Sequence, residues 1–340
     1  MNQFHCNETF QLESGELLHG ITIAYSTYGE LNSDRSNVVW VCHALTANSE
    51  VTSWWPGVVG EGQAINPEKY FIVCANILGS CYGTTGPLSQ DLSGEPFYHR
   101  FPFITIRDMV KVHLRLCLHL QIEKIALLMG GSMGGYQVLE WAVMKPEMIR
   151  RIFLIATSAS ESAWGIAIHT TQRLAIEADG TWLHETDNAG SKGLKAARAI
   201  GMLSYRNYGI LVQKQTDEDK EKLDHYRASS YIQYQGDKLV KRFNAYSYWL
   251  LTKSMDTHHL ARGRGKSLEA VLKTILQPAL IIGVSSDILC PLQEQQYLAR
   301  HIIRSTYAEI DSAYGHDGFI IESTAISYHL HRWLDDESRS

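Results

Sequence analysis

Short apolar runs alternate with segments of helical periodicity at both ends of this chain. Two runs, at 38–44 (VVWVCHA) and 70–76 (YFIVCAN), are too short for helices and too apolar for strands with one face in water, so they predict central strands. The run at 125–132 predicts another buried strand, and the segments 151–159, 278–287 and the shorter 308–315 predict further strands. Residues 9–29 instead alternate apolar and polar positions around the polar turn ESGE, which predicts an antiparallel hairpin at an edge of the sheet.

Helical periodicity fills the spaces between several of these runs. The segment 108–122 carries apolar residues at helical spacing, with Asp108 in its first turn. Residues 136–146 form a second, apolar helix that Pro146 ends, and 324–334 has the pattern of an amphipathic helix. Strands that alternate with helices in this way predict an α/β fold with a mostly parallel, doubly wound sheet.

The alternation stops between Ser160 and Gln277, where helical stretches follow one another with polar linkers. At ~150 residues per domain, 340 residues correspond to about two domains or to one large α/β domain with an insertion. We expect a core of residues 1–159 and 278–340 and a helical insertion of residues 160–277. Because ligands bind at the carboxyl edge of open α/β sheets, an insertion over that edge would act as a lid.

Composition narrows the classes of function. The chain is 45% hydrophobic and 20% charged with a formal net charge of -5, which favours a globular fold and gives no electrostatic basis for binding nucleic acid. No apolar run has the length of a membrane span, and the first residues lack a basic and then apolar leader, so a soluble, cytoplasmic protein is expected. The cysteines and histidines show no CxxC or HExxH spacing, so we expect reduced thiols and no metal site.

The strongest local signal is the segment GGSMGG at 130–135, which contains GxSxG directly after a predicted strand and directly before an apolar helix. That context is typical of a nucleophile elbow, in which a sharp turn presents the serine, here Ser132. Glycine neighbours suit such a turn because flanking backbone passes close by. A tight turn that holds a serine by chance is the alternative, since GxSxG alone is short and common.

A serine nucleophile needs a general base and a carboxylate that orients this base. Asp287 stands at the end of a predicted strand, and His316 lies in a glycine-flanked loop before the last helix. Ser132, Asp287 and His316 thus follow one another in the chain order of α/β hydrolases. Singly, such an aspartate is more often a helix cap and such a histidine a loop residue bonded to backbone. Three strand-end positions in the correct order favour a catalytic triad.

An oxyanion needs two hydrogen-bond donors near the serine. The helix after the serine directs its positive end at the reacting oxygen and leaves the Met133 backbone N–H free to stabilise an oxyanion. A second donor is expected from the loop after an earlier strand, where the Leu45 N–H, in HALT, is in the right place. For the side chains of His43 and Thr46 in that loop, a structural role that holds the loop together is favoured.

Longer segments go beyond the short serine motif. They are HALTANS, YFIVCANILGSCYGTTGP, FPFITIRDMV, GGSMGGYQVLEWA, TQRLAIEAD, GLKAARAIGMLSYR, YIQYQGDKLVKRFNAYSYWLLT, RGRG, SSDILCPLQEQ and YGHDGF. Together they resemble the homoserine O-acetyltransferase family of α/β-hydrolase-fold acyltransferases over nearly the whole chain, including the insertion. This resemblance implies the α/β-hydrolase fold, with Ser132, Asp287 and His316 on the family's triad.

The resemblance also implies a substrate site. The arginine of the family's AR motif falls on Arg198, the aspartate after the triad histidine falls on Asp317, and Tyr205 matches a tyrosine near the same pocket. Homoserine carries a carboxylate, an ammonium and a hydroxyl group, so Arg198 is expected to bind the carboxylate bidentately and Asp317 the ammonium. Without the resemblance, Arg198 fits a solvated helix residue or a structural ion pair equally well.

The resemblance finally implies a reaction and its partners. The reaction is a ping-pong transfer of acetyl from acetyl-CoA to L-homoserine through an acetyl-serine, in methionine biosynthesis, by an enzyme that is often a homodimer. Acetyl-CoA is then a co-substrate, no bound cofactor is expected, and the partners are small molecules instead of nucleic acid or a membrane. Four alternatives stay open: a succinyl-CoA donor, a serine acceptor, a simple esterase, and a non-catalytic binding module.

Overall fold

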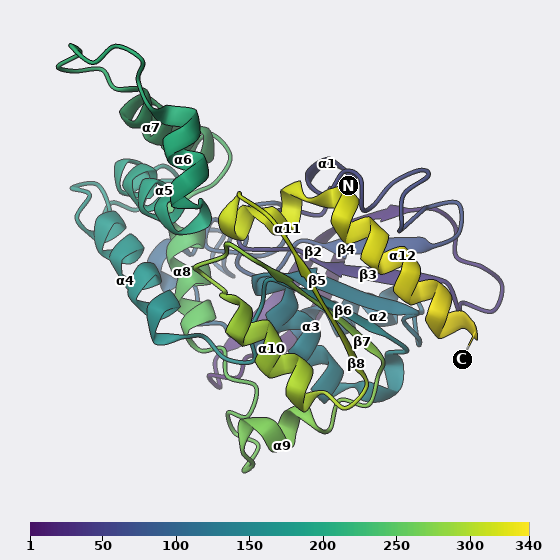
Figure 1. Ribbon diagram of the computed structural model, residues 1–340. Helices are drawn as coiled ribbons and strands as arrows, with labels where there is room; N and C mark the ends of the chain where they lie inside the picture. Colours follow the sequence, from purple (N-terminus) through teal and green to yellow (C-terminus); the bar gives the residue numbers. More distant parts are fainter. Residues whose placement is uncertain (340) are drawn as a thin grey trace.

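A single twisted sheet with helices on both faces forms the centre of the computed structural model, which describes residues 1–339 (Figure 1). Its eight strands lie in the order β1-β2-β4-β3-β5-β6-β7-β8. They are β1 (Asn2–Gln11), β2 (Leu17–Tyr28), β3 (Val38–Cys42), β4 (Phe71–Ala75), β5 (Leu127–Gly131), β6 (Ile152–Ile155), β7 (Ala279–Val284) and β8 (Ser305–Ile310). The pairs β1–β2 and β2–β4 are antiparallel and all other pairs are parallel, which confirms the predicted mostly parallel, doubly wound sheet.

The hairpin at the sheet edge is longer than its sequence pattern indicated. β1 begins at Asn2, although the alternation that predicts the hairpin starts at residue 9. In β1 only Cys6 and Phe10 are buried, because an edge strand leaves most of its side chains in water. Because β1 is held mainly by backbone pairing to β2, its sequence has little apolar periodicity, and the pattern did not predict a strand in its first half.

The central strands are apolar at every position because helices cover both of their faces. Trp40 of β3 belongs to the core cluster that includes residues of α2, α3 and α10 on one face of the sheet, whereas Val39 and Val41 belong to the cluster that includes residues of α1, α11 and α12 on the other. These helices are α1 (Val51–Trp54), α2 (Ile106–His119), α3 (Met133–Met144), α10 (Leu292–His301), α11 (Gly318–Ile321) and α12 (Ser323–Arg339). Short 3-10 turns lie at η1 (Tyr98–Arg100), η2 (Pro146–Met148) and η3 (Gly315–Asp317).

Two helices begin earlier than predicted, and each has a local cause. α2 starts at Ile106, because the Thr105 side chain accepts from the Asp108 N–H and the Asp108 carboxylate accepts from the Thr105 N–H. α3 starts at Met133, directly after Ser132 and three residues before its apolar pattern becomes clear. The helix α10 was not predicted, since its sequence LQEQQYLARH is mostly polar and buries only Gln295 and Leu298.

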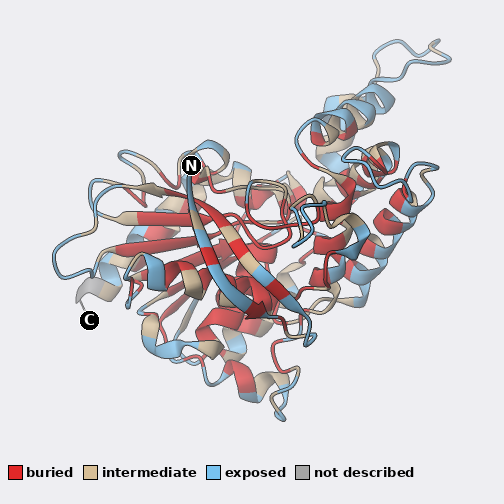
Figure 2. Ribbon diagram, turned by 180° about the vertical axis from the view of Figure 1, so that it is seen from behind, coloured by how far each residue is buried: buried red, intermediate tan, exposed pale blue. Residues whose placement is uncertain are grey.

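Between β6 and β7 the chain forms helices and adds no strand to the sheet within the described residues. The helices are α4 (Ala163–Glu177), α5 (Ser191–Tyr205), α6 (Tyr208–Gln215), α7 (Arg227–Val240), α8 (Ala245–Asp256) and α9 (Leu268–Leu272). α4 packs on α5 and α8, α5 packs on α7, and α6 and α7 project away from the sheet (Figure 1). Figure 2 shows buried residues concentrated in and around the sheet, whereas the tip of this projection is exposed. No helix in residues 1–339 is long and apolar enough to span a membrane.

A network of arginines and glutamates fastens the end of this helical segment to the core. Arg107 of α2 contacts Glu140 of α3 and Glu13 of the β1–β2 turn, each at 2.6 Å. Arg262, in the segment after α8, donates to both oxygens of Glu13 at 2.7 and 3.0 Å, and Arg264 donates to Glu140. Glu140 is almost fully buried, so the stability of its charge depends on the guanidinium groups of Arg107 and Arg264.

We predict that Glu140→Gln lowers the free energy of unfolding by about 3 kcal/mol, because it leaves two half-buried arginines with one carboxylate fewer. Chemical denaturation of the full chain measures this change. Glu147→Gln is the matched control, since Glu147 is largely exposed and 3.7 Å from Lys145. The control is expected to change the free energy by less than about 1 kcal/mol. Equal effects of the two substitutions would contradict a structural role for the network.

Candidate active site

Ser132 lies in the sharp turn that joins β5 to α3. Its φ is 55° and its ψ is -130°, a strained backbone conformation for a residue other than glycine. A Cβ at Gly134 would lie 2.1 Å from the Cys42 carbonyl oxygen, and one at Gly130 would lie 2.5 Å from the Gly134 oxygen. Glycines are therefore required for α3 to begin this close to β3, and the strain at Ser132 is held by the packing around it.

The structure brings the side chains of Ser132, His316 and Asp287 together. Ser132 Oγ lies 2.9 Å from His316 Nε2, and His316 Nδ1 lies 2.6 Å from Asp287 Oδ2. Ser132 follows β5, Asp287 follows β7, and His316 lies in η3 after β8, so three strand ends supply the three groups. This is the spatial arrangement that the chain order predicts for a catalytic triad.

Asp287 is fixed by its own turn before it meets the imidazole. Its Oδ1 accepts from the N–H groups of Leu289 and Cys290 at 2.8 and 2.9 Å, which leaves Oδ2 for His316. The His316 Nδ1–H donates to this carboxylate, so Nε2 is free to accept the Ser132 hydroxyl proton. Burial alone would lower the pKa of His316, but the charge and hydrogen bond of Asp287, with the charges of Asp317 and Glu161, raise this pKa above its ordinary value.

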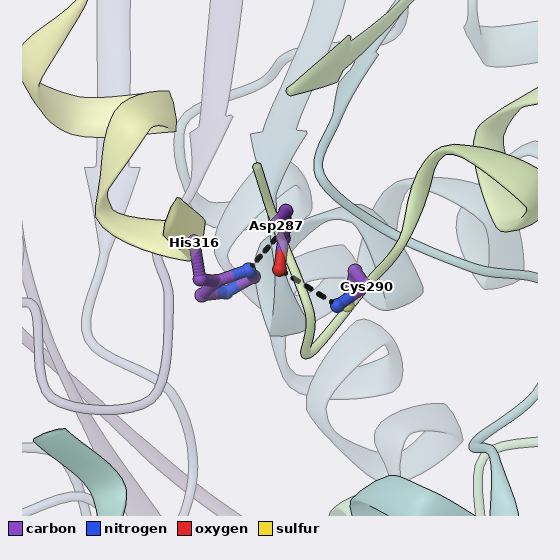
Figure 3. A group of neighbouring side chains, drawn as sticks. All are labelled: Asp287, Cys290 and His316. Carbon is purple, nitrogen blue, oxygen red and sulfur yellow. Dashed lines mark hydrogen bonds and ion pairs between the residues drawn. The ribbon is translucent and has the colours of Figure 1, made fainter. Parts of the chain in front are cut away.

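Asp287, Cys290 and His316 form the one group of three potential metal ligands found in the described residues, with ligand atoms within 4.8 Å of one another (Figure 3). Both oxygens of Asp287 already accept hydrogen bonds, one of them from the His316 ring. Burial and the charges of Asp287 and Glu161 raise the pKa of the Cys290 thiol well above its usual value, which keeps a proton on the sulfur. The contacts therefore fit a hydrogen-bonded acid–imidazole pair better than a metal site.

Two backbone N–H groups near Ser132 have no partner within the described chain. Met133 is the first residue of α3, where an N–H has no partner inside the helix, and the Leu45 N–H donates to no other described residue. Gln137 donates from Nε2 to the carbonyl oxygens of His43 and Met133 at 3.1 and 3.2 Å, which ties the two donor segments to each other. The two segments that carry the predicted oxyanion donors are thus joined by one buried side chain.

A cavity of about 430 Å³ opens above the serine, between the sheet edge and helices of the insertion. Ser132 and His316 lie on its wall, and the predicted substrate residues Arg198, Tyr205 and Asp317 line it as well. A larger open groove of about 640 Å³ runs along the β1–β2 hairpin and residues 85–97, but no triad residue lines it. The chemistry therefore belongs to the smaller cavity.

The predicted substrate residues differ in how their charges are placed. The Arg198 guanidinium lies 5.2 Å from the centre of the Tyr205 ring and has no carboxylate partner among the described residues. Asp317 is paired with Arg206, whose Nη2 lies 3.2 Å from the carboxylate. The Tyr205 ring lies 6.0 Å from the His316 ring. Beside the triad the cavity thus holds the Arg206–Asp317 pair and two arginines without a carboxylate partner among the described residues, Arg198 and Arg242.

Sequence reasoning missed Arg206 and His169, which line this cavity. Arg206 directly follows Tyr205 in the family-like stretch LSYR, but nothing in the sequence pairs it with Asp317. His169 of α4 bonds to Asp256 at 3.0 Å, and Arg173 contacts the other oxygen of Asp256 at 2.5 Å. His169 and Asp256 are 87 positions apart, so no local pattern marks this second histidine–carboxylate pair.

Comparisons with known proteins agree with the fold and show the family. The family model described as the alpha/beta hydrolase fold matches residues 37–323. A homoserine O-acetyltransferase of Cyclobacterium marinum is 48% identical over 96% of this chain and 93% of its own length. One of Chlorobaculum tepidum is 46% identical over 95% of this chain and 92% of its own length.

Solved structures show the same fold at lower identity. A homoserine O-acetyltransferase from Bacillus anthracis superposes with a TM-score of 0.89 at 23% identity and covers 98% of this chain and 96% of its own. Esterase E22 also gives a TM-score of 0.89, at 21% identity, and covers 98% of this chain and 99% of its own. Fold alone therefore does not separate transfer from hydrolysis. On its matches over nearly the full length, the chain belongs to the homoserine O-acetyltransferase family of the α/β-hydrolase fold.

Proposed function

We propose that this protein is a homoserine O-acetyltransferase, which transfers acetyl from acetyl-CoA to the hydroxyl of L-homoserine through an acetyl-Ser132 intermediate in methionine biosynthesis. The observation that carries the proposal is the Ser132–His316–Asp287 chain of hydrogen bonds beneath a cavity with an unpaired arginine. The relatives that bear this name are 41% to 48% identical to the chain over nearly its full length.

The first half-reaction acylates the serine. His316 Nε2 takes the hydroxyl proton as Ser132 Oγ bonds to the thioester carbon, and the carbonyl electron pair moves onto the oxygen. The backbone N–H groups of Leu45 and Met133 stabilise this oxyanion. When the carbonyl re-forms, the carbon–sulfur bond breaks, the thiolate of coenzyme A takes a proton from His316, and acetyl-Ser132 remains.

The second half-reaction needs the acceptor hydroxyl at the same histidine. Arg198 binds the carboxylate of homoserine, which is the role that its unpaired guanidinium suits. Asp317, next to His316, binds the ammonium group and shares its charge between that group and Arg206. His316 then takes the hydroxyl proton as the homoserine oxygen bonds to the acetyl carbon. The bond between that carbon and Ser132 Oγ breaks, and Ser132 Oγ takes the proton back from His316.

Water competes with homoserine as an acceptor, so the cavity must favour the amino acid. We propose that residues 160–277 act as the lid, since α4, α5 and α8 supply His169, Arg198 and Met255 to the cavity wall. A positioned hydroxyl can reach an effective molarity of about 10⁵ M or more, which outweighs the concentration of water. The lid therefore acts by orienting homoserine as well as by restricting solvent.

Three finer statements accompany this proposal. The enzyme uses acetyl-CoA as a co-substrate and holds no resident cofactor. It acts in the cytoplasm on small molecules. It forms a homodimer, for which the support is a group of exposed apolar side chains on the projecting helices and the loop between them: Tyr208, Val212, Leu223, Tyr226 and Tyr234.

Acetyl-CoA alone is expected to place an acetyl group on Ser132, because the first half-reaction needs no acceptor. Mass spectrometry of the intact and digested protein detects this label, and L-homoserine is expected to remove it as O-acetylhomoserine. Ser132→Ala is expected to abolish the label. Faster labelling by succinyl-CoA, or faster discharge by serine, would replace the proposed donor or acceptor, and discharge by water as fast as by homoserine would make the protein an esterase.

Arg198→Ala is expected to raise the KM for homoserine about 30- to 100-fold, since a partly buried carboxylate loses its cation. The rate of acylation by acetyl-CoA should stay close to that of the wild type, because the donor does not need this guanidinium. Arg198→Lys should recover only part of the loss, as a lysine cannot bind both carboxylate oxygens in a fork. Steady-state kinetics with varied homoserine, beside single-turnover acylation, measures both. An unchanged KM would remove Arg198 from the acceptor site.

The rate of acylation is expected to fall as pH drops through the pKa of His316, because only the neutral ring accepts the serine proton. This pKa is raised partly by Asp317, so Asp317→Asn should move the midpoint of the pH profile to lower pH, and the freed Arg206 should add to the shift. Single-turnover acylation by acetyl-CoA across pH measures the midpoint. Asp311→Asn is the control, because Asp311 is exposed and bonded to Ser285. A midpoint that moves upward in Asp317→Asn would contradict this account.

A further inference from the structure

The Leu45 N–H belongs to a tight turn that is closed by hydrogen bonds to the Ala44 carbonyl oxygen. The Ala47 N–H donates to the Ala44 carbonyl oxygen at 3.0 Å and closes the turn 44–47. His43 Nδ1 contacts the same carbonyl oxygen at 2.9 Å. Two donors therefore converge on the Ala44 oxygen.

The role of His43 follows from its burial and its two contacts. Its Nε2 lies 3.1 Å from the Ile77 N–H, which can only donate, so Nε2 accepts. Burial lowers the pKa of His43 to about 4, so the ring is neutral near pH 7 and its one proton is on Nδ1. The Nδ1–H thus donates to Ala44, and both lone pairs of that carbonyl oxygen are used.

Because the peptide group is planar, the two hydrogen bonds to the Ala44 carbonyl oxygen also fix the direction of the Leu45 N–H. In a trans peptide the carbonyl oxygen of one residue and the N–H of the next point in opposite directions. Because the Ala44 oxygen is held inside the turn, the Leu45 N–H points away from it. Leu45 lines the cavity with Ser132, and its N–H has no partner in the described chain.

Arg242 reaches the same turn from the helical insertion. It lies just before α8, and its Nη1 donates to the Thr46 carbonyl oxygen at 2.5 Å and to the Tyr82 hydroxyl. The Thr46 carbonyl and the Ala47 N–H belong to one peptide group. A continuous chain therefore runs from the guanidinium through the Thr46–Ala47 peptide and then through the Ala44–Leu45 peptide.

We propose that Arg242 is a positioning residue that acts through these two peptide groups to aim and polarise the Leu45 N–H toward the oxyanion. Hydrogen bonds in such a chain strengthen one another, and a bond from a cation is stronger than a neutral one. The positive end of the chain then points at the oxygen that gains the electron pair when Ser132 attacks. The insertion thus supplies a lid and also completes the oxyanion site. This inference rests on the proposed acylation of Ser132.

A direct role in binding the donor is the competing explanation. Arg242 is exposed and lines the cavity, and coenzyme A carries phosphates that an arginine can bind. The two roles predict different dependence on the donor. A phosphate-binding arginine matters only for a donor with phosphates, whereas a residue that serves the oxyanion matters for every acetyl donor.

The test compares single-turnover acylation of Ser132 by acetyl-CoA and by p-nitrophenyl acetate, which has no phosphate. Arg242→Met is expected to slow acylation about 10-fold with both donors, less than the loss of a direct oxyanion donor, and to leave the donor KM unchanged. Arg242→Lys should recover part of the rate, since it keeps a charged donor. Lys241→Met is the matched control, because it removes a neighbouring exposed cation that does not line the cavity, and it should acylate at the wild-type rate.

Infrared spectra of the acetyl-enzyme provide a second readout that a purely structural role would not move. With ¹³C-labelled acetyl, the ester carbonyl of acetyl-Ser132 should absorb at higher frequency in Arg242→Met than in the wild type, because its oxygen loses hydrogen-bonding strength. A rate loss with acetyl-CoA alone, or an unchanged rate and frequency, would overturn the inference. Failure of the proposed function is seen separately, as a wild-type protein that p-nitrophenyl acetate labels and acetyl-CoA does not.

Discussion

The hydrogen bond between Ser132 Oγ and His316 Nε2 is the interaction on which the site depends. It exists because a strained turn after β5 and a loop after β8 meet at one edge of the sheet, and because Asp287 holds the imidazole in the tautomer that accepts the serine proton. None of these conditions is local. The glycines around Ser132 allow α3 to approach β3 closely enough for the strain to be held by packing.

In the proposed function, the helical insertion contributes to the chemistry as well as to enclosing the cavity. Its far end is fixed to the core by Arg262 and Arg264, which pair with glutamates of the hairpin turn and of α3. Nearer the cavity it supplies Arg198, which lies on the cavity wall, Arg206, which pairs with Asp317, and Arg242, which donates to the Thr46 carbonyl oxygen.

The elements that the sequence predicted well are those whose environment repeats along the chain. The central strands lie between two layers of helices, so each of their positions is apolar, and the strands were placed to within a few residues. Ser132 and Asp287 were found because each follows a central strand, and His316 because it lies in a glycine-flanked loop before the last helix. The edge strand β1 was predicted too short, and the polar helix α10 was missed. Both elements bury few side chains, so their sequences carry little apolar periodicity.

The sequence by itself determined the alternation of strands and helices, the elbow around Ser132, the order of the triad and, through longer segments, the family. Only the tertiary structure decided which polar groups meet. Asp317 pairs with Arg206, His169 bonds to Asp256, and Arg242 donates to the Thr46 carbonyl oxygen, which lies 196 positions away in the chain. The physical reason is that local and tertiary interactions act over different distances along the chain. Backbone propensity and burial period act over neighbouring residues, whereas ion pairs and carbonyl contacts depend on the distance between elements after the sheet and the insertion have packed.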